Sequence, residues 1–109
     1  KGILDKAIHE LKKAAQLKPE HLDAHYNLGI AYAMKGLYAD AMDEMNLAIK
    51  YNANDYSAYR DLGLLYFKYK KDTQKSLYYL NESLRLAPNP AEAKKVKDMI
   101  NSINTGQGF

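Results

Sequence analysis

Hydrophobic residues recur along the chain at the three- and four-residue spacing of an amphipathic α-helix. Tyr38, Ala41, Met45 and Ile49 fall on one face of such a helix, and a similar stripe begins at Leu4. Proline is absent from residues 20–87, and the stripes are interrupted by short segments that favour turns. The pattern predicts an all-α chain with helices at residues 3–17, 22–35, 38–51, 56–69, 73–86 and 91–103.

One stretch of side chains occurs twice, 34 residues apart. Residues 25–32, HYNLGIAY, correspond to residues 59–66, YRDLGLLY, and share a leucine, a glycine and a tyrosine at the same places. Each stretch is followed by a second pattern that contains a small residue, Ala41 in the first case and Ser76 in the second. Self-similarity at this period is typical of helical repeat proteins.

Glycines stand in the middle of two predicted helices, at Gly29 and Gly63. A glycine in a helix interior costs about 1 kcal/mol relative to alanine, so each needs a packing reason. We expect Ala41 and Ser76 to lie against them, where two antiparallel helices approach closely.

The period, the Leu-Gly-x2-Tyr stretch and the small residue after it resemble the tetratricopeptide repeat over residues 1 to about 90. His25 and Tyr59 stand where that family often has Trp, Ala53 stands where it has Pro, and a lysine replaces the usual turn glycine within residues 69–73. The resemblance implies antiparallel helix-turn-helix repeats stacked into a right-handed superhelical solenoid, with about two and a half repeats and a C-terminal capping helix.

The resemblance also implies the organisation of the chain as a single domain over residues 1–109. Its parts would be the second half of a truncated repeat (1–21), two repeats (22–55 and 56–90), a capping helix (91–104) and a flexible tail (105–109). The chain starts at Lys1 without an initiator methionine or a signal-peptide pattern, so we expect it to be a piece of a longer protein. Asn89, Pro90 and Glu92 have the spacing of a helix cap, a first helical residue and a capping-box partner for the last helix.

Composition argues against catalysis and cofactor binding. The 109 residues contain no cysteine, which excludes disulfides, thiolate metal sites and cysteine nucleophiles. Histidine occurs only three times. No phosphate-binding loop or nucleophile elbow is present, and no apolar run is long enough to span a membrane. His21 and His25 have the i, i+4 spacing of metal ligands, but the counterpart of His25 is Tyr59, so we expect a core histidine. We therefore expect no enzyme activity, cofactor or metal, and the sequence leaves the cellular compartment open, with the cytoplasm as the default.

The net charge of +3 is too small to indicate a nucleic-acid partner. Several lysines lie within residues 68–75, and others line one side of the last predicted helix. Lysine clusters of this kind are usually solvated surface. To bind nucleic acid, such a surface would need aromatic side chains between the lysines, on which the bases could stack. Tyr69 is close to these lysines, but it falls on the predicted core stripe of its helix. Nucleic-acid binding is therefore not favoured.

The first helix of each repeat carries a second stripe of side chains that its paired helix does not need. In solenoids of the tetratricopeptide type, these helices line a concave groove, so the resemblance implies that this stripe contacts a bound peptide. The expected peptide-binding residues are Tyr26, Asn27, Ile30, Met34, Ser57, Arg60, Asp61, Leu64, Phe67 and Lys68.

The stripe narrows the class of ligand. Asn27 matches the inner-face asparagine of family members that grip acidic chaperone tails, but Ser57 and Asp61 stand where their cations would be. The lining instead favours a partner segment with Leu, Phe or Tyr anchors, and Arg60 and Lys68 are available to an acidic flank. The sequence thus predicts a non-catalytic protein-protein interaction module or scaffold.

An alternative is a structural repeat unit that drives self-assembly. The first predicted helix shows the stripe Leu4, Ala7, Leu11 and Ala14 without a preceding partner helix. Exposed apolar stripes seek cover, so a homo-oligomer through this helix is the second hypothesis.

Overall fold

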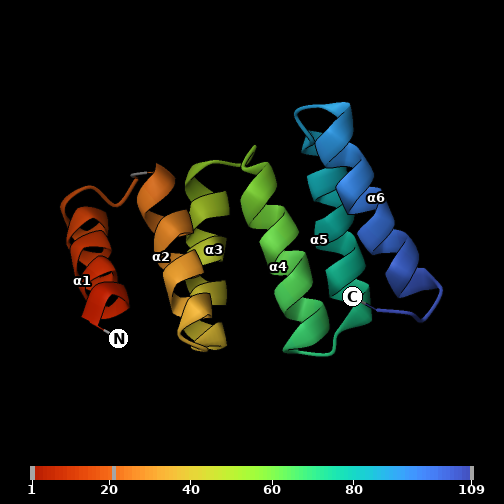
Figure 1. Cartoon of the computed structure of the whole chain (residues 1–109). Helices are drawn as coiled ribbons and strands as arrows, with labels where there is room; N and C mark the ends of the chain where they lie inside the picture. The colour runs from red at the N-terminus through yellow and green to blue at the C-terminus, as the bar shows by residue number, and fades with distance from the viewer. Residues whose placement is uncertain (1, 21, 109) are drawn as a thin grey trace. The chain divides into compact units, whose positions relative to one another are not determined.

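The helices predicted from the apolar pattern are present. The structure is a computed structural model that describes residues 2–20 and 22–108, and no strand occurs within those ranges. Every helix begins and ends within one residue of its predicted bounds. The helices are α1 (Gly2–Leu17), α2 (Leu22–Met34), α3 (Tyr38–Tyr51), α4 (Tyr56–Lys68), α5 (Thr73–Leu86) and α6 (Pro90–Asn104) (Figure 1).

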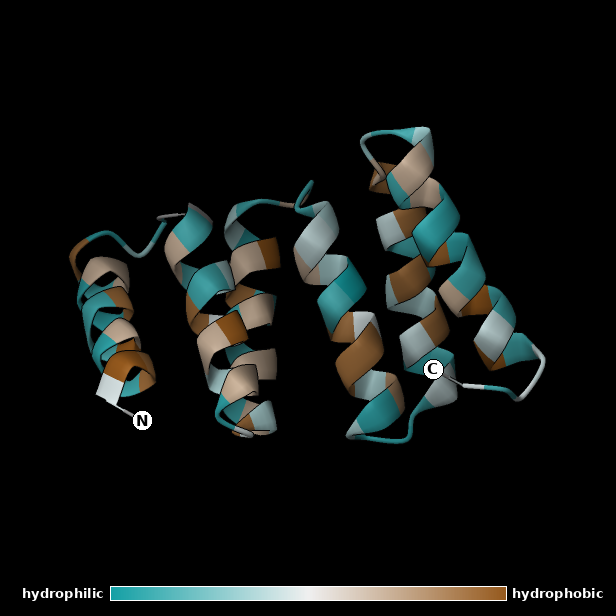
Figure 2. Ribbon diagram, viewed as in Figure 1, coloured by the Kyte–Doolittle hydropathy of each residue, from teal (hydrophilic) through white to brown (hydrophobic). Residues whose placement is uncertain are grey.

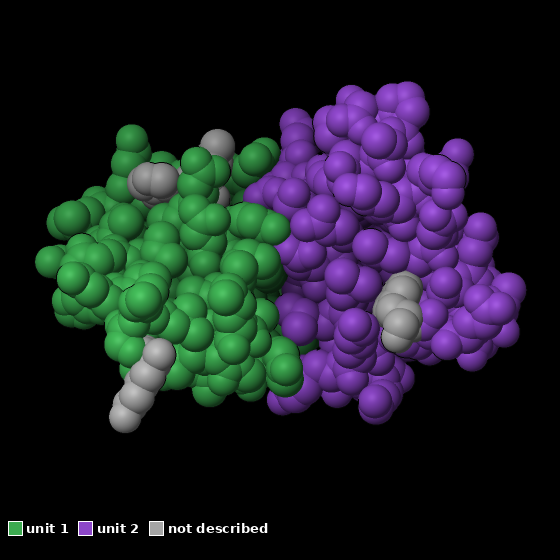
Figure 3. Space-filling view, in the orientation of Figure 1, with its two compact units in different colours: residues 1–53 green, residues 54–109 purple. Residues whose placement is uncertain are grey.

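The chain divides into two compact units, unit 1 at residues 1–53 and unit 2 at residues 54–109 (Figure 3). Unit 1 holds α1, α2 and α3, and unit 2 holds α4, α5 and α6. Most helices carry both hydrophobic and hydrophilic segments in Figure 2, as amphipathic helices do. The prediction of an all-α chain of helical repeats is therefore confirmed.

In unit 1, α2 and α3 form an antiparallel hairpin, and α1 packs beside α2. The buried residues of the hairpin include Leu28 and Ala31 on α2 and Met45 and Ala48 on α3. Gly36 makes the turn between the two helices with a φ of +81°, a conformation that suits glycine because it has no Cβ.

The mid-helix glycines lie where paired helices approach closely, as expected. A Cβ added at Gly63 would lie 2.7 Å from Leu80 Cγ and 3.2 Å from the carbonyl oxygen of Ser76. A Cβ at Gly29 would lie 3.0 Å from Met45 Cε and 3.2 Å from the carbonyl oxygen of Ala41. In both helix pairs, α2–α3 and α4–α5, a glycine in the first helix thus allows close contact with the second.

In unit 2, α4 and α5 form the second antiparallel hairpin, and α6 packs on α5. The core joins Leu80 of α5 to Val96 and Ile103 of α6, with Phe67 of α4 packed against them. Helix starts in this unit are capped, because the side chains of Asp55, Asp72 and Asn89 each accept a hydrogen bond from the backbone N–H three residues further on. Each such cap contributes about 1 kcal/mol.

The turn between α4 and α5 differs from its counterpart in unit 1. Helix α4 ends at Lys68, and Tyr69 follows it with 44% of its surface exposed. The expectation that Tyr69 belongs to the core stripe is wrong, because the helix stops one residue before it. Lys71 has a φ of +56° in this turn, where unit 1 has Gly36.

Candidate functional site

The predicted binding residues of unit 1 lie on one side of α2. Tyr26, Ile30 and Met34 are four residues apart and therefore share a helical face, and Asn27 lies next to them. Tyr26 and Ile30 are half-buried, Asn27 is exposed, and Met34 exposes 72% of its surface. We call these four residues the α2 surface.

The predicted binding residues of unit 2 follow α4 from its first turn to its last. All are half-buried except Lys68, which is exposed at the end of the helix. We call this set the α4 surface: Ser57, Arg60, Asp61, Leu64, Phe67 and Lys68.

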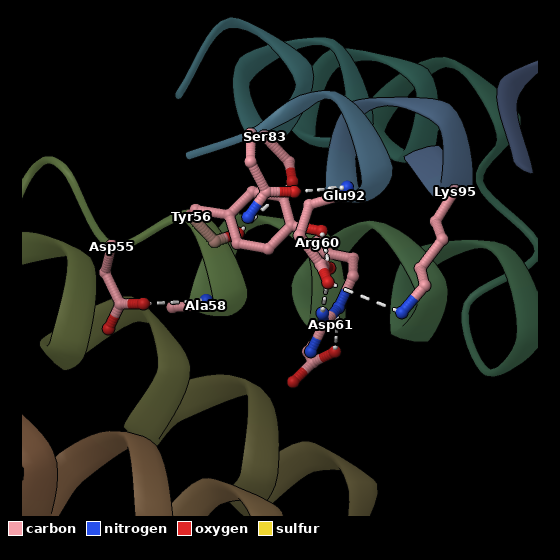
Figure 4. Close-up of polar contacts among 9 residues, drawn as sticks. Asp55, Tyr56, Ala58, Arg60, Asp61, Ser83, Glu92 and Lys95 are labelled. Carbon is pink, nitrogen blue, oxygen red and sulfur yellow. Dashed lines mark hydrogen bonds and ion pairs between the residues drawn. The ribbon is translucent and has the colours of Figure 1, made fainter. Parts of the chain in front are cut away.

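Arg60 is held by carboxylates of unit 2 (Figure 4). Its Nε donates to Asp61 Oδ1 at 3.0 Å, and Nη1 lies 3.9 Å from Glu92 Oε1. The guanidinium also lies over the ring of Tyr56, 5.3 Å from the ring centre. An acidic partner at Arg60 would therefore compete with two carboxylates of the chain itself.

Glu92 links α6 to α4 (Figure 4). The hydroxyl of Tyr56 donates to Glu92 Oε1 at 2.8 Å, and Lys95 Nζ donates to Oε2 at 3.4 Å. These donors, with the nearby guanidinium of Arg60, lower the pKa of Glu92 below its ordinary value of 4.5. Burial, and then the bond to Glu92, raise the pKa of Tyr56 above 10.0.

The helix cap predicted at the start of α6 is half confirmed. Asn89 Oδ1 accepts from the N–H of Glu92 at 2.9 Å, and Pro90 begins the helix. The carboxylate of Glu92 bonds to Tyr56 and Lys95 rather than completing a capping box. Sequence reasoning missed this link because its partners lie 36 residues apart and no local pattern relates them.

Phe67 contacts both the core of unit 2 and the segment that follows α6. Its side chain packs against the core of Leu80, Val96 and Ile103. The backbone of Gly108 lies close to the ring edge, since a Cβ added there would be 3.7 Å from Phe67 Cε2. Phe67 therefore supports α6 as well as contributing to the α4 surface.

The end of α4 borders a pocket of about 270 Å³. Its lining residues are Phe67 and Lys68 of α4, Lys71 of the turn and Thr73 of α5. The pocket therefore combines an aromatic ring, two ammonium groups and a hydroxyl within unit 2.

His25 is a buried residue of unit 1, as its correspondence to Tyr59 predicts. Its Nδ1 lies 2.8 Å from Glu44 Oε1, its Nε2 lies 2.6 Å from the carbonyl oxygen of Pro19, and its ring stacks on Tyr51 at 5.6 Å. Both ring nitrogens are thus engaged, and neither is left for a metal ion. The other half of the i, i+4 pair, His21, lies outside the described residues.

Metal-binding clusters and membrane-spanning helices are both absent from the part of the chain that the structure describes. Residues 2–20 and 22–108 contain no group of three His, Cys, Asp or Glu side chains that could hold a metal ion. Within the same ranges, no helix has both the length and the apolar character needed to cross a membrane.

Comparison with known proteins gives two matches. Residues 2–63 match the tetratricopeptide repeat family. The BBSome complex member BBS4 of Bos taurus is 36% identical over 58 residues, which cover 53% of this chain and 11% of that protein. The chain therefore corresponds to a small part of this curated relative.

Proposed function

The chain belongs to the tetratricopeptide repeat family, and from this membership we propose that it is a non-catalytic module that binds a peptide segment of a partner protein. Repeats of this family generally mediate protein-protein interaction. The proposal assigns the contacts to the α2 surface in unit 1 and the α4 surface in unit 2.

The observation that carries the proposal is a row of apolar side chains on α2 that stay partly or largely exposed. Leu28 and Ala31 on α2 are already buried within the chain. Tyr26, Ile30 and Met34 add a second apolar row, and Met34 is largely exposed. Because a helix that is apolar all round is normally buried, this row supports contact with a further partner.

The chemistry of the α2 surface suits a segment with apolar anchors. Side chains at i, i+4 and i+8 present a continuous row, onto which Leu, Phe or Tyr side chains of a partner can pack. The exposed amide of Asn27 beside this row can both donate to and accept from a peptide backbone. The expected ligand is thus an extended or helical segment rather than a small molecule.

Selection of peptides from a random display library on the immobilised chain tests the proposal. Met34→Glu should weaken binding of the selected peptides by about tenfold or more, because it places a charge on the apolar row. Leu17→Glu is the matched control, since Leu17 is also a largely exposed apolar residue of unit 1 and lies outside the α2 surface. Equal losses in both variants, or no loss in Met34→Glu, would overturn the assignment.

Self-assembly through α1 is the second candidate function. The stripe on which this hypothesis is based is half-buried rather than exposed: Leu4, Ala7, Leu11 and Ala14. No residue of α1 is fully buried, and Ile3 and Leu17, outside that stripe, expose 88% and 86% of their surfaces. Apolar side chains this exposed favour association with another apolar surface. This hypothesis is compatible with peptide binding, because it uses a different helix.

A further inference from the structure

The pocket at the end of α4 has a composition that suits one kind of ligand group. Phe67 contributes an aromatic ring to the lining, and Lys68 and Lys71 contribute ammonium groups. Thr73, the first residue of α5, adds a hydroxyl. An apolar wall beside two cations fits a segment that carries an apolar side chain next to a carboxylate.

Lys71 occupies a backbone conformation that disfavours its residue type. Its φ of +56° lies in the left-handed region, where a Cβ clashes with the backbone and glycine is normally found. The corresponding turn of unit 1 uses Gly36 at a φ of +81° for the same purpose. Strain of this kind persists where the rest of the structure, or the function, requires it.

Hydrogen bonds within the turn account for the backbone conformation of Lys71, but they do not require a lysine side chain at this position. The N–H of Lys70 donates to the carbonyl of Leu65 at 3.2 Å, and the N–H of Asp72 donates to that of Tyr66 at 2.9 Å. These bonds fix the backbone on either side of Lys71. The ammonium group of Lys71 makes no hydrogen bond or ion pair with any described residue, so its side chain adds nothing polar to the fold.

Positive charge gathers around this turn. Lys68, Lys70, Lys71 and Lys75 are all exposed within eight residues of sequence. The single carboxylate among them, that of Asp72, accepts from the N–H of Lys75 as the cap of α5. The surface beside the pocket is therefore complementary to an acidic partner.

We propose that this pocket binds an acidic segment of a partner protein, with a carboxylate between Lys68 and Lys71 and a neighbouring apolar side chain against Phe67. The inference rests on the proposed function, because it concerns one end of the α4 surface. It places recognition of an acidic flank at Lys71 instead of Arg60, since Arg60 is already held by Asp61 and Glu92.

The test uses two synthetic peptides and the full chain labelled with nitrogen-15. In one peptide, a phenylalanine is flanked by three glutamates on each side, and in the other the glutamates are replaced by glutamines. The glutamate peptide should shift the amide resonances of residues 67–73, and the shifts should diminish with added salt. The glutamine peptide should produce much smaller shifts there.

Lys71→Gly separates binding from folding. Glycine suits the positive φ, so the unfolding temperature should stay the same or rise, whereas affinity for the glutamate peptide should fall roughly fivefold. Lys71→Arg should keep most of the affinity. Lys97→Gln, at an exposed lysine of α6 in the same unit, is the charge control and should leave affinity nearly unchanged.

Each contrary outcome has a distinct meaning. If the glutamate peptide binds the α2 or α4 surface equally well in Lys71→Gly, the pocket assignment is wrong and the proposed function stands. If neither this peptide nor any selected peptide binds the chain, both proposals fail. If a single-stranded oligonucleotide binds residues 67–73 more tightly than the glutamate peptide, the pocket does not serve a protein partner.

Discussion

The hydroxyl of Ser76 donates a hydrogen bond to the carbonyl oxygen of Gly63 across 2.7 Å, from one helix of the second hairpin to the other. Both residues are buried, and the approach is possible because Gly63 has no side chain. Ala41 holds the corresponding place opposite Gly29 in the first hairpin, without a hydroxyl. The shared requirement of the two hairpins is therefore small size, and the hydrogen bond is an addition in unit 2.

Gly63→Ala should destabilise unit 2. The new Cβ would lie 2.7 Å from Leu80 Cγ, near the base of a fully buried side chain that cannot move aside easily. Overpacking of this kind costs about 1–3 kcal/mol, and the gain in helix propensity of about 1 kcal/mol offsets only part of it. Thermal unfolding followed by circular dichroism should show a lower midpoint.

Gly29→Ala is the matched comparison in unit 1. Its Cβ would first meet Met45 Cε at 3.0 Å, the end of a flexible side chain that can shift. We expect it to lower the midpoint less than Gly63→Ala does. An equal or larger loss for Gly29→Ala would contradict the account of close packing at Leu80.

The link between Glu92 and Tyr56 should make unit 2 sensitive to acid. Because the pKa of Glu92 is lowered in the folded chain, its carboxylate stabilises the fold above the ordinary value of 4.5, and this contribution is lost as the pH falls through the lowered pKa. Unfolding temperatures measured between pH 7 and pH 3 should fall less steeply in Glu92→Gln than in the wild type.

Two further variants identify the cause of that acid sensitivity. Tyr56→Phe removes the hydroxyl that contributes most to the lowered pKa, so it should reproduce much of the effect of Glu92→Gln. Asp98→Asn alters a carboxylate that pairs with Lys94 on the same helix, and it should change the pH profile less. The same profile in all of these proteins would show that the link to α4 contributes nothing.

Any self-association of the chain should depend on α1. Ile3→Glu with Leu17→Glu places charges on its two most exposed apolar positions, and neither position is needed for packing within unit 1. Sedimentation should show a lower average mass for the double variant at high concentration, with unchanged helicity. A tight dimer that both substitutions leave intact would assign the association to another surface.

The helices and the close contact of each hairpin could be predicted because both depend on local sequence. The spacing of apolar residues predicts the helices. A glycine inside a helix lowers its stability, so Gly29 and Gly63 indicate that a neighbouring helix packs too closely for a side chain. The link from Glu92 to Tyr56 could not be predicted, because it depends on how α6 packs against residues far away in sequence. The same packing places Phe67 against the core and brings the carboxylate of Glu92 to Arg60, two features that the stripe on α4 does not reveal.

The turn at Lys71 shows a second limit of sequence reasoning. The replacement of a turn glycine by lysine is visible in the sequence, but the sequence does not show which backbone conformation the lysine adopts. The structure keeps the glycine-like conformation and bonds the residues on both sides of it. The pocket that the side chain of Lys71 lines depends on the folded structure and cannot be seen in the sequence.

The most direct test of the proposed function is a map of where a selected peptide contacts the chain. Amide and methyl resonances of the labelled protein would be followed as the tightest peptide from the display library is added. The account predicts that the largest shifts fall on the α2 surface, above all at Ile30 and Met34, and on the exposed end of the α4 surface at Lys68. Shifts confined to α1 or to the outer lysines of α6, with none on α2 and α4, would contradict it.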